Sequence, residues 1–203
     1  FIRPDERILV IEDSSELQLQ QTHVVGFETR KPDRNGRGAL TIRDLVQASL
    51  RLRPDRLVIG EIRGGESIDL LQALNTGHSG SMSTIHANSA VDSLLRLETC
   101  ALMSGIEIPL TALRAQVAAA IQVIVQTARL SDGSRKITGI AEVTGLQDGD
   151  YVVKDLYTFR QDRMNADGDI VGKHAGCGNI PTFYEAAKQQ RLAMDDAWFK
   201  PAP

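Results

Sequence analysis

Residues 57–62 read Leu-Val-Ile-Gly-Glu-Ile, a short apolar run followed by an acid, and they lie shortly before Gly64-Gly65. A run of this kind is typical of a strand buried on both faces of a parallel sheet, and Pro54 ends the helical pattern that precedes it. The carboxylate at the end of such a strand lies at the rim of the sheet, where it can meet Mg²⁺ or a water molecule. Glu61 is therefore the first candidate for a catalytic and metal-binding residue.

The segments around this run alternate between two patterns. Helical patterns begin at Thr41, Ser67, Ser89 and Pro109, and three other runs resemble strands: 7–12, 23–29 and 81–86. Strands that alternate with helices predict an α/β fold with a doubly wound, mainly parallel sheet. In such folds the site lies beyond the carboxyl ends of the strands.

A second acid follows a strand in the same way. Glu12, or its neighbour Asp13, comes after the apolar residues 8–11. A strand that ends in an acid is common, so one such residue is a weak signal of function. Two neighbouring parallel strands would place both carboxylates on one rim, and this convergence favours a site over coincidence.

Two histidines lie on either side of Ser79-Gly80-Ser81. His78 and His86, with the hydroxyl groups around them, could contact or sense a phosphate. The alternative is a pair of hydrogen-bonded structural histidines. A zinc site is disfavoured because their spacing matches no common ligand pattern and no third ligand is nearby.

Basic residues gather between the second and third predicted strands. They could form a solvated face, or they could contact a nucleotide phosphate, including one across a subunit boundary. A nucleic-acid surface is disfavoured because the flexible part of the cluster has no interleaved aromatic residues. The members are Arg30, Lys31, Arg34, Arg37, Arg43, Arg51, Arg53 and Arg56.

The pattern changes after about residue 121. Runs at 123–130, 137–144 and 151–160 alternate between apolar and polar residues and are separated by Asp-Gly pairs, which predicts antiparallel strands as an edge extension. From Gln161 onward the chain is polar and glycine-rich apart from a helical pattern at 183–191. We therefore expect one domain over 1–160 and a C-terminal tail or appendage over 161–203.

Composition sets the remaining limits. The chain has 203 residues, 42% of them hydrophobic, and a formal net charge of −3, which provides no global basic field for nucleic acid or anionic lipid. Two cysteines without C-x-x-C spacing favour a reducing compartment, and no segment has the pattern of a membrane span. Because it opens at Phe1 almost directly on a strand, we expect the chain to be cut from a longer protein.

Three motifs, in this order, resemble those of the secretion and pilus-assembly ATPases of type II and type IV systems. The likeness is greatest to the Tad (Flp) pilus branch and covers most of residues 7–160. The motifs are an acidic box at 10–16, a Walker-B segment at 53–64 and a histidine box from Asn75-Thr76-Gly77-His78 to His86-Ala87-Asn88.

The resemblance implies a RecA-like ATPase core that binds ATP and Mg²⁺. It also implies a homo-hexamer that works with pilus or secretion platform proteins at the cytoplasmic face of the inner membrane. By the same resemblance, Glu61 would organise Mg²⁺ or the attacking water, with support from Glu12 and Glu16. His78 and His86 would couple phosphate state to subunit movement, whereas Arg51 and Arg63 would contact phosphates or a neighbouring subunit.

One departure from the family pattern concerns the phosphate-binding loop. The Walker-A loop should lie just upstream of Arg7, and the 203 residues do not contain it. Without its backbone cradle and its lysine most phosphate affinity is lost, so we expect the isolated chain to be inactive. Two alternatives stay open: a noncatalytic module that docks partners, and a DNA-transfer relative, which salt-sensitive binding through residues 30–37 would favour.

Overall fold

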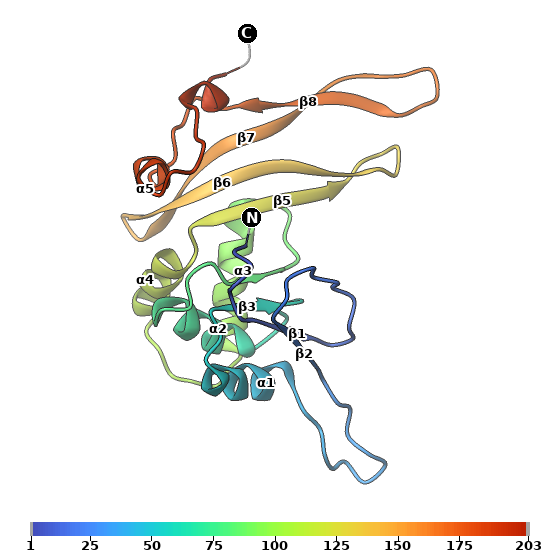
Figure 1. The fold of residues 1–203 in the computed structure, drawn as a ribbon, viewed down its shortest axis with the longest axis vertical. Coiled ribbons are helices and arrows are strands. Elements are labelled where there is room, and N and C mark those ends of the chain that lie inside the picture. The colour runs from blue at the N-terminus through green and yellow to red at the C-terminus, as the bar shows by residue number, and fades with distance from the viewer. Residues whose placement is uncertain (1, 202–203) are drawn as a thin grey trace. The chain divides into compact units, whose positions relative to one another are not determined.

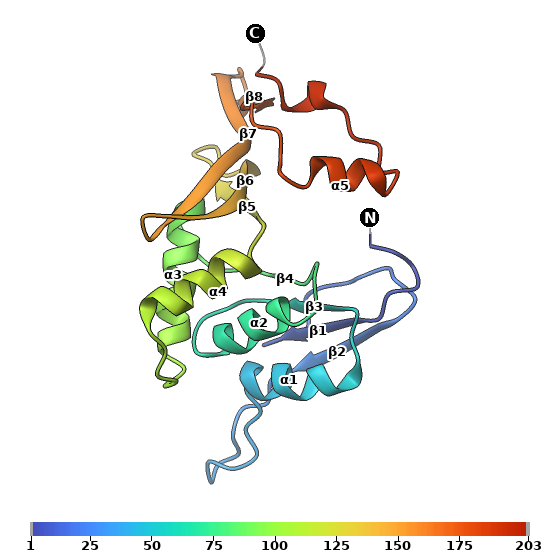
Figure 2. The ribbon, with the colours of Figure 1, turned by 90° about the vertical axis from the view of Figure 1, so that its left-hand side faces the viewer.

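The computed structural model describes residues 2–201, which form two compact units. The first unit contains residues 2–88 and 92–120, and the second contains residues 89–91 and 121–201. Each carries a sheet of its own (Figures 1 and 2). Among the described residues, no helix has the length and apolar character needed to cross a membrane.

The first unit is built on a parallel sheet in the order β2-β1-β3-β4. Every residue of β1 is buried because strands pair with it on both sides. The strands are β1 (Ile8–Glu12), β2 (Val24–Glu28), β3 (Arg56–Ile59) and β4 (Met82–Ser83). The parallel strands expected from the sequence are therefore confirmed, although β4 is only two residues long.

Four α-helices accompany this sheet: α1 (Ile42–Ser49), α2 (Glu66–Asn75), α3 (Ala90–Leu102) and α4 (Leu110–Ala120). Thr41 and Asp44 form a reciprocal capping box that starts α1, as their spacing predicts. The helix tightens into the 3₁₀ turn η1 (Leu50–Leu52), and Arg53 ends it in a left-handed conformation just before Pro54.

The two faces of the sheet are covered differently, because successive side chains of a strand point to opposite faces. On one face Leu9 and Leu57 pack with Ala73 of α2, and Leu50 of η1 lies against them. On the other face Ile8, Val10 and Val58 form a cluster. Ile2 and Leu19, which belong to no regular element, pack against that cluster.

The second unit is an antiparallel sheet in the order β5-β6-β7-β8. Its strands are β5 (Val123–Arg129), β6 (Arg135–Gln147), β7 (Asp150–Met164) and β8 (Ile170–Gly176). The Asp-Gly pairs stand in the first two turns, where Gly133 and Gly149 adopt positive φ angles of 83° and 88°. The antiparallel strands expected from the sequence are present, as a sheet of their own rather than as additions to the edge of the parallel sheet.

The C-terminal segment joins this second sheet. β7 continues to Met164 and pairs with β8, so strand pairing crosses the boundary expected between residues 160 and 161. The sequence did not predict β8 because its glycines and Lys173 interrupt the alternation of apolar and polar residues that marks a strand. Gly172 is needed there, since a Cβ atom would lie 2.3 Å from the carbonyl oxygen of Arg160 on β7. Two short helices follow β8: α5 (Tyr184–Gln189) and η2 (Asp196–Phe199). The rings of Tyr184 and Tyr157 pack on Phe199, with centroids 6.0 and 5.6 Å away.

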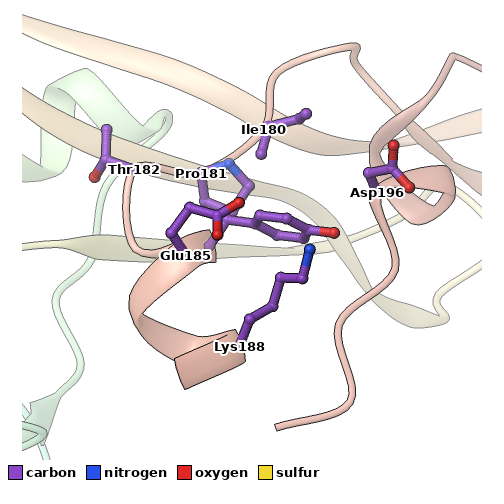
Figure 3. Close-up of a pocket in the computed structure, with 7 residues that line it drawn as sticks. Ile180, Pro181, Thr182, Glu185, Lys188 and Asp196 are labelled. Carbon is purple, nitrogen blue, oxygen red and sulfur yellow. The ribbon is translucent and has the colours of Figure 1, made fainter. Parts of the chain in front are cut away.

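A pocket of about 400 Å³ lies in this C-terminal segment (Figure 3). Its wall carries charges of both signs, from Glu185, Lys188 and Asp196, and the Lys188 ammonium lies 4.8 Å from the centre of the Tyr184 ring. None of the residues that line it was a candidate from the sequence.

Candidate active site

Glu12 and Glu61 leave the parallel sheet at the same rim. Ile11 of β1 is in register with Ile59 of β3, and each acid follows within two residues of this pair. Gly60 allows the close approach of the two strand ends, because a Cβ atom there would lie 3.1 Å from Cγ of Glu12. Strand pairing thus brings together two carboxylates that are 49 positions apart in sequence, as the residue numbers show.

The Glu12 carboxylate organises the loop that follows β1. It is 7% exposed, and its Oε1 atom accepts hydrogen bonds from the backbone N–H groups of Glu16 and Leu17, both at 3.2 Å. Glu16 meets Glu12 through its backbone, and its own side chain is exposed. A buried carboxylate that accepts two backbone N–H groups holds its loop in one conformation.

Two side chains hold Glu61, the guanidinium of Arg63 and the imidazole of His86. Its Oε2 atom lies 2.5 Å from a guanidinium nitrogen of Arg63, and its Oε1 atom lies 2.8 Å from Nδ1 of His86. The Arg63 hydrogen bond chiefly, with a smaller contribution from His86, lowers the pKa of Glu61 below its ordinary value. Glu61 is therefore a carboxylate at neutral pH, with one side-chain oxygen directed to Arg63 and the other to His86.

Arg63 connects the two strand ends. Besides Glu61, its guanidinium contacts Asp13, which follows β1, at 3.3 Å. Glu66 at the start of α2 accepts hydrogen bonds from the backbone N–H groups of Arg63 and Gly64, at 2.6 and 2.8 Å. The segment that carries Arg63 is thus held at its backbone while its side chain lies between two acids.

Thr84 places His86 beside Glu61. Its hydroxyl donates to the carbonyl of Gly60 at 2.5 Å, and its carbonyl accepts from the N–H of Ile62 at 2.8 Å. These two bonds join the segment after β4 to the exit of β3. The His86 side chain is 79% exposed, so the imidazole meets Glu61 at the surface.

The other sequence candidates lie apart from this group. His78 is partly buried, and its ring nitrogen and its backbone N–H both lie 3.2 Å from the carbonyl of Ala73, at the end of α2. Arg51 donates to the carbonyl of Gln47 at 3.1 Å. The structure thus brings together Glu12, Asp13, Glu61, Arg63 and His86, and it gives His78 and Arg51 partners within their own part of the chain.

Sequence analysis missed three residues that support this group: Glu28, Glu66 and Thr84. Glu28 ends β2 and accepts from the N–H of Ser15 at 2.9 Å, which holds the acidic loop from its other side. Because Glu28 is an acid at the end of a strand, like Glu12, the sequence could have indicated it as a candidate. The roles of Glu66 and Thr84 come from hydrogen bonds with the backbone, which residue type alone does not indicate.

The side chains at this rim could supply some, but not all, of the ligands of a magnesium-bound nucleotide. Within residues 2–201, no group of three or more His, Cys, Asp or Glu side chains could hold a metal ion. Mg²⁺ commonly binds one or two carboxylates and takes its other ligands from phosphates and water, so Glu61 and Glu12 supply a suitable protein share. Arg63 and His86 carry the N–H groups that phosphate oxygens accept from.

Comparisons with known proteins agree on one family. The sequence model described as "Type II/IV secretion system protein" matches residues 1–183. The chain is 40% identical, over 82% of its length, to a protein of Mycobacterium tuberculosis that is named as a candidate conjugal transfer protein. It is 38% identical, over 66% of its length, to the type IV secretion system protein PtlH of Bordetella pertussis.

A solved structure has the same fold. The VirB11 ATPase from the Brucella suis type IV secretion system, crystallised with sulphate, superposes on 70% of this chain with a TM-score of 0.60 and 28% identity. The match confirms the RecA-like α/β fold. The chain spans less than half the length of these proteins: 46% of the mycobacterial relative, 41% of PtlH and 41% of the VirB11 chain.

Proposed function

Because the chain belongs to the type II/IV secretion system protein family, we propose that it is part of a motor ATPase that hydrolyses ATP to drive pilus assembly or secretion. The observation that carries this proposal is the ionised Glu61, held by Arg63 and His86 at the rim of the parallel sheet. A carboxylate in this position can orient a water molecule for attack on a phosphate.

Each residue of the rim has a distinct task in this proposal. Glu61 accepts a hydrogen bond from the attacking water and, with Glu12, offers carboxylate oxygens to Mg²⁺. The ion, when bound, neutralises charge on the phosphates. Arg63 and His86 exchange part of their contact with Glu61 for phosphate oxygens, so the presence of phosphate changes how Glu61 is held. His78, at the end of α2, acts with His86 in passing that change to a neighbouring subunit.

The phosphate groups need a cradle that these 203 residues do not supply. The nearest sequence, Gly168 to His174, has three residues between its glycines where the Walker-A pattern has four, and it ends in His where Ser or Thr would bind Mg²⁺. In the structure this stretch enters β8 of the antiparallel sheet. ATP turnover therefore requires a phosphate-binding loop from outside these residues.

The finer parts of the proposal follow from the motif order. We propose a homo-hexamer at the cytoplasmic face of the inner membrane that acts with platform proteins of a Tad-type pilus. In this assembly Arg51 and Arg63 contribute phosphate or inter-subunit contacts. A second candidate is DNA transfer in conjugation, which the name of the mycobacterial relative favours. A module that only docks partners is the noncatalytic alternative.

Phosphate release separates the enzyme from the docking module. We expect the 203-residue chain to release phosphate from ATP no faster than background. The same chain, extended by the segment encoded upstream, should turn over ATP in a Mg²⁺-dependent manner. Turnover by the isolated chain would refute the need for an external loop, and a folded extended protein that binds ATP without turnover would favour the docking module.

A further inference from the structure

The C-terminal segment of the second unit, residues 177–201, is folded onto the antiparallel sheet. The carboxylate of Glu142 in β6 accepts hydrogen bonds from the N–H and the hydroxyl of Thr182. The ring of Phe199 packs on that of Tyr184, and both residues are buried. The surface of this segment is therefore held in one arrangement before any partner binds, which lowers the entropic cost of binding.

Large apolar side chains lie on the outside of the same segment. Ile180, Phe183, Leu192 and Trp198 are each between 39% and 57% exposed. The rings that precede or follow Phe183 and Trp198 in the sequence are buried, so the fold uses those rings and leaves these two in water. Single exposed apolar residues are ordinary, but several that gather in one short folded segment mark a surface for interaction.

The pocket in this segment has more acidic than basic groups. Glu185 of α5 and Asp196 of η2 both line it (Figure 3). Within residues 2–201, neither carboxylate forms an ion pair, whereas the Lys188 ammonium lies 4.8 Å from the centre of the Tyr184 ring and interacts with that ring. Two unpaired carboxylates beside an engaged ammonium favour a ligand that brings a positive charge.

This surface lies at the end of the region that the family model matches, and beyond it. The model ends at residue 183, whereas α5, η2 and most of the pocket wall follow that residue. Glu61 and its partners belong to the first unit, and the pocket belongs to the second. ATP hydrolysis at the rim of the parallel sheet makes no use of these residues, so their role is a separate one.

We propose that this surface docks a segment of a protein partner that presents large apolar side chains beside a lysine or an arginine. The cationic group enters the pocket and pairs with Glu185 and Asp196, while the apolar side chains cover Ile180 and Trp198. Lysine and arginine suit such a site because they carry their charge on an apolar stem.

The chemistry of the pocket disfavours other occupants. Small-molecule sites are lined mostly by apolar side chains, whereas this wall includes Glu185, Lys188 and Asp196. Two carboxylates also repel the phosphates of nucleic acids and of anionic lipids. A polypeptide is the ligand class that offers apolar and cationic side chains together.

The fluorescence of Trp198 reports on this surface directly, because it is the only tryptophan of the chain. The 203-residue chain is titrated with a synthetic helical peptide of leucine and lysine, and with a matched peptide of leucine and glutamate. Neither peptide contains tryptophan. We expect the lysine peptide to move the emission of Trp198 to shorter wavelengths, because contact removes water from the indole ring. The glutamate peptide should leave the emission unchanged, and salt should weaken binding of the lysine peptide.

A pair of double variants tests the carboxylates. Glu185→Gln with Asp196→Asn should raise the Kd of the lysine peptide about fivefold, through the loss of two exposed ion pairs. Asp162→Asn with Asp167→Asn makes the same change of charge at two exposed acids that do not line the pocket. This control should keep the Kd of the parent.

A second pair of variants tests the apolar contact. Ile180→Ser should raise the Kd of the lysine peptide about threefold, because it removes apolar area from the contact. Val171→Ser, at an exposed valine of β8 outside the pocket wall, is the control and should bind as the parent does. The melting temperature of each variant should stay close to that of the parent, since the replaced side chains are exposed.

Four results would overturn the docking site. The first is an unchanged Trp198 emission with the lysine peptide, and the second is equal affinity for the two peptides or for the two double variants. A shift of the emission by phosphatidylcholine vesicles alone would make the surface a membrane contact. Dimerisation of the chain at the titration concentration, lost in Ile180→Ser, would make a second copy the occupant. None of these results affects the proposed function, which is measured by phosphate release.

Discussion

Each unit of the molecule holds one glutamate in a network of hydrogen bonds, and the two networks differ. Glu61, in the first unit, is held by two exposed side chains, those of Arg63 and His86. Glu142 of β6, in the second unit, is 2% exposed. It accepts from the N–H of Thr182 at 2.8 Å and from its hydroxyl at 2.5 Å.

This difference indicates that Glu61 can take part in chemistry, whereas Glu142 stabilises the fold. The partners of Glu61 are long side chains in contact with water, which can exchange a carboxylate for a phosphate without unfolding anything. The partners of Glu142 are short neutral donors, one of them in the backbone, and they connect the segment before α5 to the middle of the sheet. Replacement of a buried group of this kind leaves donors without partners.

The largest expected effect is on turnover, at Glu61. In the upstream-extended protein, Glu61→Gln should retain Mg·ATP but lose about a hundredfold or more in rate, because the amide keeps the shape of the side chain and removes its charge. The measurements are steady-state phosphate release and nucleotide binding. Glu107→Gln, which replaces an exposed acid between α3 and α4, is the control and should keep the parent rate. A Glu61→Gln protein as active as its parent would make Glu61 a structural strand end.

The next effect is on stability, at Glu142. Glu142→Ala should lower the free energy of unfolding by about 2 kcal/mol, because the N–H and the hydroxyl of Thr182 both lose their acceptor in a buried place. Urea unfolding of the 203-residue chain measures the change. Glu142→Gln, which keeps one acceptor oxygen, should lose less. Equal stability of the parent and the alanine variant would show that the C-terminal segment does not depend on this carboxylate.

Replacement of the two histidines should affect stability to different extents. His78→Ala removes a ring that bonds to the end of α2 and should cost about 1 kcal/mol of stability. His86→Ala removes an exposed ring and should change stability by less than about 0.5 kcal/mol. In the extended protein, His86→Ala should leave ATP affinity nearly intact and remove the dependence of hydrolysis on protein concentration. The measurements are the melting temperature of each variant and its rate of ATP hydrolysis at several protein concentrations. A destabilised His86→Ala protein that keeps this dependence would end the coupling role.

The smallest effect is expected at Asp132, in the turn between β5 and β6. The N–H of Ile170 donates to its carboxylate at 2.7 Å, and this bond, with two from Ser134, lowers the pKa of Asp132 below 3.8. The carboxylate therefore stabilises the fold at pH values above 3.8, and this contribution is lost as the pH falls through the lower pKa of the folded state. Asp132→Asn should lower the urea midpoint slightly at pH 7. The difference from the parent should shrink in acid, and a constant difference would contradict this origin.

Local patterns in the sequence determined the elements and the residues at their ends. The parallel strands were predicted from apolar runs, the start of α1 from its Thr-Asp spacing, and the first two antiparallel turns from their Asp-Gly pairs. These features depend on neighbours within a few positions. Glu12 and Glu61 could be placed on one rim because parallel strands share the direction in which they end.

Only the tertiary structure decided which side chains have partners. The sequence does not distinguish His78 from His86, and it does not show that Arg43 pairs with Asp69 or Arg56 with Glu6. It also did not indicate that Glu142 bonds to a residue 40 positions away. Such partners come together through packing between distant segments, and their energies depend on burial and on distances that residue type and spacing do not contain. Chemistry-bearing residues were therefore predictable here, whereas the choice between a structural and a functional role required the folded chain.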